Sequence, residues 1–476
     1  MCAAVVAALS SMSLAFAEGL PDLGESSQNE LPPQMERKIG EEAMNEIRFR
    51  EPAYLDDVEV NGYLTRLVGR MATHLDGARP NFDVFALRDP MLNAFAMPGG
   101  FIGVHSALIL AAQSESELAS VLAHEMSHVT QHHLARSIAP QQQAQTASML
   151  AMAVAILAAR SRPDLAMGAA VSGQAAAVQS QLSYTRDFER EADRIGLALL
   201  ERSNFDIRGM GDFFSRMEKF GRLYENNAPA YLRTHPLTTE RITDMENRIQ
   251  VRPYRQVADS LDFLLVKAKL KAQEGSADEA VTGFSSLLTE GKYRSEAAVR
   301  YGLARAYLRA NNVPAAEKEV QALRRLKVGN TMVETLAADV ARQQGDAEGA
   351  LRILRNARAK AKQERAISYA LIELLLETRQ AEEALRVVNE EVQSYTTDDK
   401  FYLFQARAHE ALGHNFLQHR AIAQAYLLRG QVAAAVEQLE LAQKAQDGDF
   451  YEHSQADAKL RELQAQLIAE ERKKRR

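Results

Sequence analysis

The chain has 476 residues, of which 46% are hydrophobic and 25% are charged, and its formal net charge at pH 7 is −6. A chain of this length is expected to fold into two or more domains, and the composition is that of an ordinary soluble protein. The small negative charge provides no electrostatic basis for binding nucleic acid, so we expect no nucleic-acid partner.

The first 17 residues are apolar and uncharged, and they end in Ala15-Phe16-Ala17, the small-residue pattern of a signal-peptide cleavage site. We therefore predict a signal peptide over residues 1–17 and an exported protein; the signal permits the periplasm but does not identify the compartment. Cleavage removes Cys2, the only cysteine, which excludes cysteine chemistry and disulfides in the mature chain. Basic residues are missing ahead of the apolar stretch, so we expect the true translation start to lie further upstream.

Residues 18–34 are rich in Gly, Ser and Pro and are expected to form a linker. Helical periodicity follows from about residue 35 to residue 78. The alternation of Phe82, Val84 and Ala86 with polar neighbours then predicts a strand.

A β-hairpin is predicted next. Its first strand is Asn93-Ala94-Phe95-Ala96-Met97, its turn is Pro98-Gly99-Gly100, and its second strand covers residues 101–104. As an edge strand beside the following helix, Asn93, Ala94, Phe95 and Ala96 would bind an extended peptide by main-chain hydrogen bonds. The alternative is a core hairpin that binds no ligand, and spacing alone leaves both interpretations open.

The segment from His124 to His128 reads H-E-x-x-H within a predicted helix, which begins at a capping-box-like pair, Ser114 and Glu117. Residues four apart lie on one helix face, about 6 Å apart along its axis, so both imidazoles can bind one metal ion. Glu125 lies where it can take a proton from a water at the metal. This pattern predicts a zinc peptidase site with one Zn²⁺ per chain, His124 and His128 as ligands and Glu125 as general base. The alternative is a solvated helix with two surface histidines.

The third metal ligand is not in the same helix. An extended H-E-x-x-H-x-x-G-x-x-H pattern would need a glycine where the chain has Gln131 and a histidine where it has Leu134. His132 and His133 are expected to be surface residues on the next turn.

Residues 147–159 are continuously apolar, but these thirteen residues are too few to span a bilayer, which needs about 20. We expect a buried or interfacial helix there, with peripheral membrane contact as one role, and no transmembrane segment in the mature chain. The surrounding stretch 141–180 is expected to be a mobile lid, a membrane-touching loop or a poorly specified packing helix.

A downstream acidic segment carries Glu189 and Asp193, which are four residues apart and share one helix face. Catalytic zinc commonly binds two His and one Glu, so we assign Glu189 to the metal. Asp193 is expected to accept an N–H from a ligand histidine and fix its tautomer, whereas Glu191 is expected to face solvent. The alternative is an ordinary acidic face, on which Glu189 and Asp193 would repel each other without a cation nearby.

From about residue 257 the strand signals end and a repeat appears. Ala280, Ala316, Ala350 and Ala384 are 36, 34 and 34 residues apart, and each follows a polar turn. This period is that of tetratricopeptide helix pairs, which stack into an α-solenoid with a concave surface for protein segments. Ala435 repeats the pattern half a unit out of phase. The alternative is a generic α-helical domain.

Together, the H-E-M-S-H motif, the E-R-E-A-D segment ending at Asp193, the segment from Asn93 to Gly100, the exported start and the repeats resemble the M48 family of zinc metallopeptidases. The resemblance covers nearly the whole mature chain, and it implies Glu189 as third ligand. Thr234-His235-Pro236, followed by Arg241, resembles a family segment whose histidine can bind the metal as a fourth ligand. His235 is therefore expected to act as a latch, because a closed tetrahedral site lacks the position that water needs. Without the resemblance, His235 would be interpreted as a surface loop histidine.

The expected fold is mainly α, with a zincin-like α+β metallopeptidase domain and a small sheet over residues 35–256. An α-solenoid of tetratricopeptide-type helix pairs follows over 257–466, and the charged tail 467–476 is expected to fray. The resemblance implies a periplasmic endopeptidase with chaperone-like activity on unfolded or misassembled outer-membrane β-barrel proteins, docked on their assembly machinery through the repeats. The alternative is a non-proteolytic tetratricopeptide scaffold or chaperone with an idle peptidase domain.

Overall fold

The computed structural model describes residues 32–77, 79–137, 186–223 and 230–474. The predicted signal peptide, most of the predicted linker, the apolar stretch 147–159 and the stretch 141–180 lie outside these residues. None of the helices that are described is long and apolar enough to cross a membrane.

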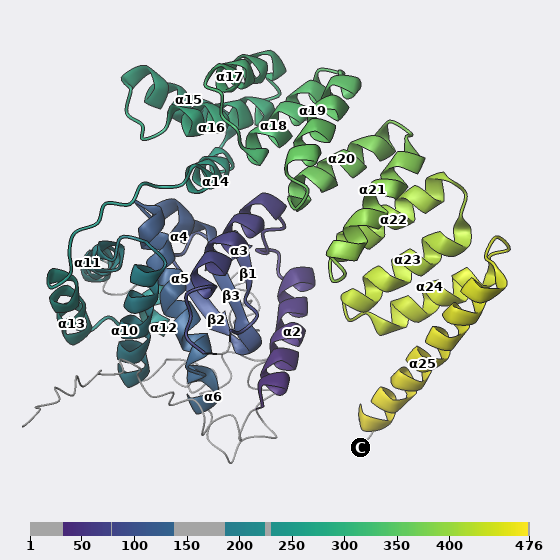
Figure 1. Ribbon diagram of the computed structural model, residues 1–476, viewed down its shortest axis with the longest axis horizontal. Helices are drawn as coiled ribbons and strands as arrows, with labels where there is room; N and C mark the ends of the chain where they lie inside the picture. Colours follow the sequence, from purple (N-terminus) through teal and green to yellow (C-terminus); the bar gives the residue numbers. More distant parts are fainter. Residues whose placement is uncertain (1–31, 78, 138–185, 224–229, 475–476) are drawn as a thin grey trace, which may run out of the picture.

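A three-stranded sheet lies in the N-terminal half of the protein (Figure 1). Its strands are β1 (Asp83–Leu87), β2 (Ala94–Met97) and β3 (Phe101–His105), in the order β1-β3-β2. β2 and β3 form the predicted antiparallel hairpin, and β1 pairs with β3 in parallel. β2 is an edge strand, and Asn93 falls one residue before it.

Both faces of the sheet are covered. Side chains alternate between the two faces of a strand, and here both sets are apolar. Phe85, Leu87, Phe95, Met97 and Phe101 pack with the helix α2 (Pro33–Arg50) in one cluster. Val84, Ala86, Ala94, Ile102 and Val104 belong to the main core, with the helices α3 (Val58–Ala72) and α5 (Glu115–Thr130). The strand predicted around Val84 and Ala86 is confirmed as β1, but its neighbours Phe85 and Leu87 are apolar rather than polar, because helices bury both faces of the strand.

α5 is the central helix of this half, and it is buried from Glu115 to His128. Ser114 caps it by accepting a hydrogen bond from the Glu117 N–H, while the Glu117 carboxylate accepts from Gln113 N–H, so only half of a capping box forms. Around it lie α4 (Ser106–Ala111), α6 (His133–Ser137), α10 (Arg186–Arg202), α11 (Arg208–Leu223), α12 (Ala230–Thr234) and α13 (Thr239–Gln250). α10 approaches α5 closely at Gly196, where a Cβ would lie 3.1 Å from the backbone nitrogen of His124.

The C-terminal half is a helical solenoid. Its helices are α14 (Leu261–Ala272), α15 (Ala277–Glu290), α16 (Glu296–Arg309), α17 (Val313–Arg325), α18 (Thr331–Gln343), α19 (Ala347–Lys360), α20 (Arg365–Glu377), α21 (Ala381–Ser394), α22 (Asp399–Ala411), α23 (Asn415–Leu428), α24 (Val432–Lys444) and α25 (Phe450–Lys474). The repeated alanines Ala316, Ala350, Ala384 and Ala435 are all fully buried, because small residues let paired helices cross closely. α25 continues to Lys474, so the tail extends the last helix, and the expectation that it frays stays a prediction.

The solenoid arches over the N-terminal half (Figure 1). A single apolar cluster includes residues of both halves, from Leu55 before α3 to Val340 in α18. The first solenoid helices therefore share a core with α3 and α5. Further along the arch, Lys400 Nζ lies 2.6 Å from Asp56 Oδ2, and the Arg429 guanidinium lies 5.2 Å from the Phe49 ring centroid. Because the two halves share a core and these contacts, the structure does not mark a boundary between separate domains, and the boundary predicted at residue 256 stays a prediction.

A buried polar cluster also joins the two halves. Glu59 of α3 is 8% exposed, and its carboxylate lies 2.6 Å from Lys269 Nζ of α14 and accepts a hydrogen bond from the Thr335 hydroxyl of α18. Lys269 Nζ also lies 2.6 Å from Asp57 Oδ2, and Arg305 Nη2 lies 3.6 Å from Glu59. This cluster fixes the orientation of three solenoid helices on α3, because buried charges are stable only when they are paired.

We predict that Lys269→Met lowers the free energy of unfolding by about 3 kcal/mol, because it leaves two carboxylates buried with less positive charge. The measurement is the urea unfolding midpoint of purified protein. Lys271→Met is the matched control on the same helix. Lys271 is 65% exposed and pairs with Glu274, so its loss is expected to change stability by less than about 0.5 kcal/mol. Equal midpoints for the two variants would contradict a stabilising role for the cluster.

Candidate metal centre

α5 presents His124 and His128 on one face, one turn apart, toward α10. Their Nε2 atoms are 2.9 Å apart, and both residues are almost fully buried. The alternative of a solvated helix with two surface histidines is therefore wrong. The helix is surrounded by the core on its other sides, so the two imidazoles can face only this interior cluster.

Glu189 of α10 and His235, which follows α12, complete the cluster. Glu189 Oε2 lies 3.5 Å from His124 Nε2, and Glu189 Oε1 lies 3.4 Å from His128 Nε2. His235 Nδ1 lies 3.4 Å from His124 Nε2 and 3.0 Å from Glu189 Oε1. One donor atom from each of the four residues lies within 4.8 Å of the others, and all four residues are buried.

The donor set fits a tetrahedral zinc ion. With bonds of about 2.0–2.1 Å to nitrogen or oxygen, the donors of a tetrahedral site are roughly 3.3 Å apart. Individual contacts among these residues are 2.9, 3.0, 3.4, 3.4 and 3.5 Å when both Glu189 oxygens are counted, and one donor atom from each residue lies within 4.8 Å of the others. The three nitrogens and one carboxylate oxygen would therefore move closer together around a bound ion.

The pKa shifts within the cluster show that its buried carboxylates favour positive charge nearby. Burial opposes the charged form of His124, but hydrogen bonds to Asp193 and Glu189 outweigh it and raise the pKa of His124 to about 10. Burial lowers the pKa of His128 to about 3. Burial also opposes ionisation of Glu189, yet the three histidines together hold its pKa well below the usual range. A proton on His124 thus supplies the charge that a bound cation would bring.

Glu125 lies beside the cluster and is fully buried. Burial raises the pKa of Glu125 above its ordinary value. The nearest polar neighbours of Glu125 are the backbone N–H of Ala96, which opposes the rise in the pKa, and His235 Nε2, 3.5 Å from Oε1; neither carboxylate oxygen meets full hydrogen-bond geometry with a described residue. A buried carboxylate without partners is rare in folded proteins, and its usual explanation is a functional ligand or water.

Asp193 and Arg241 surround the ligands on the side of α10. Asp193 Oδ1 lies 3.0 Å from His124 Nδ1, close to the position predicted for Asp193, although the two atoms do not meet hydrogen-bond geometry, so the predicted N–H acceptance stays a prediction. Arg241 of α13 donates from Nε and Nη2 to the two Asp193 oxygens at 2.7 and 2.8 Å, and its Nη1 lies 2.8 Å from Glu189 Oε2. Nη1 also donates to the Pro236 carbonyl at 2.8 Å. Arg241 thus ties the loop of His235 to both carboxylates, a role that its place in the T-H-P segment did not suggest.

Two expectations about the surroundings were wrong. His133 is fully buried rather than on the surface, and its Nδ1 lies 2.8 Å from His128 Nδ1. Burial and the neighbouring His128 lower the pKa of His133 to about 3. Glu191 does not face solvent freely, since its Oε2 lies 3.0 Å from His133 Nε2 and 3.1 Å from Arg136 Nη1. The partly buried His132 has φ = 50°, a left-handed conformation that turns α6 back beneath α5.

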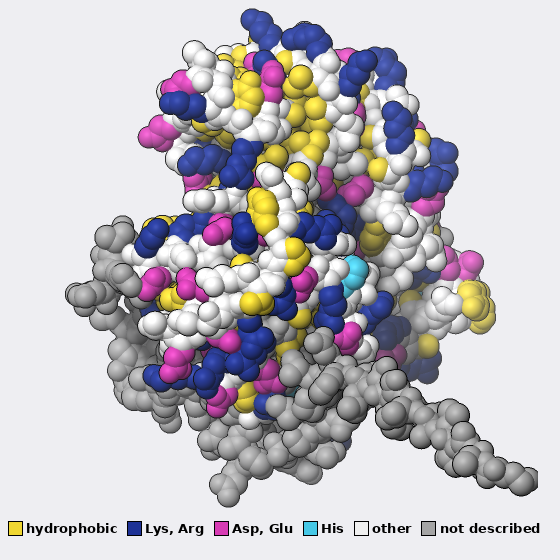
Figure 2. Space-filling view, turned by 60° about the vertical axis from the view of Figure 1, so that its left-hand side comes forward, with side chains coloured by type: hydrophobic (Ala, Val, Ile, Leu, Met, Phe, Trp, Pro, Cys, Tyr) yellow, Lys and Arg dark blue, Asp and Glu magenta, His cyan; other side chains and the backbone are white. Residues whose placement is uncertain are grey.

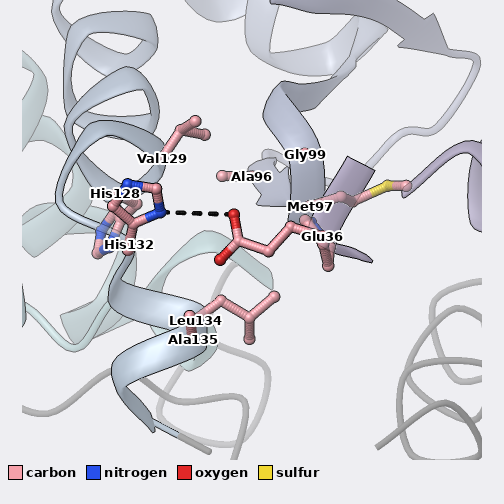
Figure 3. A pocket seen from close by; sticks show the side chains of 10 residues that line it. Glu36, Ala96, Met97, Gly99, His128, Val129, His132, Leu134 and Ala135 are labelled. Carbon is pink, nitrogen blue, oxygen red and sulfur yellow. Dashed lines mark ion pairs between the residues drawn. The ribbon is translucent and has the colours of Figure 1, made fainter. Parts of the chain in front are cut away.

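The edge strand β2 runs along the site, and Asn93 before it is 1% exposed with no hydrogen-bond partner for its amide among the described residues. A small pocket of about 20 Å³, room for about one water, opens beside the end of β2 (Figure 3). Ala96, Met97, His128 and Val129 line it, and Glu36 Oε2 and His132 Nδ1 approach within 3.4 Å across it.

Comparisons with known proteins decide the family. The model of peptidase family M48 matches residues 59–249, and a tetratricopeptide repeat model matches residues 341–408. The chain is 32% identical over 451 residues to the beta-barrel assembly-enhancing protease of Escherichia coli (strain K12), which covers 94% of this chain and 91% of that protein. The chain belongs to peptidase family M48.

Two further relatives agree with M48 membership. A putative beta-barrel assembly-enhancing protease of Vibrio cholerae is 37% identical over 300 residues, 63% of this chain and 62% of that protein. The mitochondrial metalloendopeptidase OMA1 of Arabidopsis thaliana is 28% identical over 226 residues, 47% of this chain and 43% of that protein. The chain is thus a metallopeptidase with tetratricopeptide repeats, as the sequence predicted, and the M48 family is metal-dependent.

Proposed function

We propose that the protein is a periplasmic zinc endopeptidase that is kept latent by His235 and acts in quality control and assembly of outer-membrane β-barrel proteins. The observation that carries this proposal is the buried group of His124, His128, Glu189 and His235, with donor atoms within 4.8 Å of one another. One Zn²⁺ per chain would be held by His124, His128 and Glu189, with His235 as fourth ligand in the latent state.

When bound, zinc acts as a Lewis acid that polarises a peptide carbonyl and acidifies water at the site. Glu125 takes a proton from the attacking water with its carboxylate and delivers it to the leaving amide nitrogen. Asp193 accepts the Nδ1–H of His124, which leaves the Nε2 lone pair directed into the cluster. The core around α5 excludes bulk water, and this strengthens the electrostatic interactions within the site.

The edge strand β2 would bind the substrate. An extended peptide can pair with Ala94, Phe95 and Ala96 through main-chain hydrogen bonds, and the unpartnered amide of Asn93 can accept and donate to the same peptide backbone. Recognition through the backbone suits an enzyme that acts on unfolded chains of many sequences.

The closed cluster supports latency. Four protein donors fill a tetrahedral site and leave no position for water. Arg241 holds the latch shut, because its guanidinium binds the Pro236 carbonyl and both α10 carboxylates at once. Opening the site therefore requires the His235 loop to break these contacts. The binding free energy of a docked client or partner would offset the cost of breaking them.

The names of the relatives support the substrate class and the compartment, since a match over 94% of this chain is to a beta-barrel assembly-enhancing protease. Misassembled outer-membrane proteins would be the clients. The tetratricopeptide solenoid has a fold that commonly binds other proteins, and we propose that it docks on the assembly machinery. Acidic and basic side chains are interspersed over the face of the solenoid and N-terminal half in Figure 2.

A scaffold or chaperone with an idle peptidase domain is the second candidate. Four protein donors at the metal site would leave no place for a catalytic water, so this candidate fits the closed state. The two candidates differ in what Glu125→Gln does to cells. The scaffold function predicts that the variant still supports outer-membrane assembly, whereas the peptidase function predicts that misassembled clients accumulate.

We predict that Glu125→Gln lowers cleavage of an unfolded client at least about 100-fold, the effect of removing a general base, while zinc content stays unchanged. The assay combines metal analysis with digestion of an unfolded outer-membrane protein. Glu246→Gln, an exposed glutamate on α13, is the control and should cleave at the wild-type rate. Undiminished cleavage by Glu125→Gln would rule out Glu125 as the base.

We predict that His235→Ala raises the cleavage rate while keeping zinc on the other three ligands. If closure of the latch is favoured by about 1.4 kcal/mol or more, the rate rises roughly tenfold or more, because activity follows the open fraction. The measurement is the initial rate of client digestion with zinc content in parallel. His74→Ala, an exposed histidine at the end of α3, is the control. An unchanged or lower rate with zinc retained would argue against the latch.

A further inference from the structure

We propose that His133 and Glu191 are positioning residues that fix the ring of His128 for metal binding through a hydrogen-bonded chain from Glu191 through His133 to His128. This inference rests on the proposed metal site. It concerns two residues that lie outside the H-E-x-x-H motif and outside the four clustered donors.

The chain of contacts determines where each proton lies. His128 Nε2 faces the cluster, 3.4 Å from Glu189 Oε1, so its Nδ1 faces away and lies 2.8 Å from His133 Nδ1. Two ring nitrogens this close share one proton, with one nitrogen as donor and the other as acceptor. His133 Nε2 lies 3.0 Å from Glu191 Oε2, and a carboxylate can only accept, so Nε2 carries the proton of His133. With a metal ion at His128 Nε2 in place of the contact with Glu189 Oε1, that nitrogen would carry no proton, so His128 Nδ1 would donate to His133 Nδ1.

This tautomer is the one that metal binding needs. With its proton on Nδ1, His128 presents the lone pair of Nε2 to the cluster. Ligand histidines commonly donate their other N–H to a carboxylate or carbonyl, and this contact raises their basicity. The other ligand, His124, has a carboxylate directly at Nδ1, since Asp193 Oδ1 lies 3.0 Å away. α10 therefore supports one ligand directly through Asp193 and the other through His133 and Glu191.

The ring of His133 is held from several sides. It stacks on the Phe188 ring, with ring centroids 4.6 Å apart and an interplanar angle of 9°. The Arg136 guanidinium in turn lies 4.5 Å from the centroid of the Phe188 ring. Arg136 Nη1 also binds the Glu191 oxygen that faces His133. The left-handed backbone at His132, unfavourable for a residue other than glycine, is what brings His133 under α5. These constraints fix the ring in the geometry that the relay requires.

The test measures zinc affinity by competition with a chromophoric chelator, using the full mature chain. His133→Phe keeps an aromatic ring on Phe188 but removes both nitrogens, and it is expected to weaken zinc binding 10- to 100-fold, the usual effect of losing such a support. His133→Asn keeps a polar group near the position of Nδ1 and should give an intermediate affinity. The absorption spectrum of the cobalt-substituted protein should change in His133→Phe, since it reports ligand geometry.

One control separates the relay from a general effect of the substitution. His74→Phe makes the same change at an exposed histidine away from the cluster, so it should bind zinc as the wild type does. Equal zinc affinity and an unchanged cobalt spectrum in His133→Phe would overturn the relay while leaving the metal site intact. If His133→Phe does not fold, Glu191→Leu tests the same chain from its far end, with the same expected loss and the same contradicting result. A wild type that binds no zinc would instead defeat the proposed function.

Discussion

The structure depends on one electrostatic constraint, the burial of carboxylates against imidazoles between α5 and α10. Glu125, Glu189 and Asp193 are each 1% exposed or less, and burial of charged groups is costly unless opposite charge is close by. Arg241 supplies one positive charge, and the high pKa of His124 brings a second. A metal ion in this cluster would take over the role of that proton. The close contact at Gly196 maintains the geometry, because a larger residue there would separate the two helices.

The sheet and the solenoid fix the positions of the elements that surround this cluster. The sheet is covered on both faces, so its strands cannot shift, and β2 stays an edge strand beside the site. The solenoid shares a core with α3 and α5 through its first helices and is joined to α3 by the buried charges around Glu59. The concave side of the repeats is thereby held in a defined position relative to the N-terminal half.

The sequence predicted the features that local periodicity encodes. The β2–β3 hairpin, the α5 helix and its Ser114 cap, and the repeated buried alanines were expected from spacing and composition. The errors concern contacts between distant elements. Glu191 is two residues from Glu189, which places it on a different side of α10, but only the position of α6 determines that His133 meets it there. Arg241 follows Asp193 by 48 residues, so spacing on one helix could not reveal that they pair. The left-handed turn at His132 had no glycine or asparagine to signal it.

The most direct test of this account is zinc K-edge anomalous diffraction from crystals of the exported, zinc-loaded protein. We predict one strong peak per chain, about 2.0–2.2 Å from His124 Nε2, His128 Nε2 and a Glu189 oxygen, with His235 as the fourth neighbour in the closed state. A peak bound by other residues, or a protein that folds and carries no ion between α5 and α10, would contradict it.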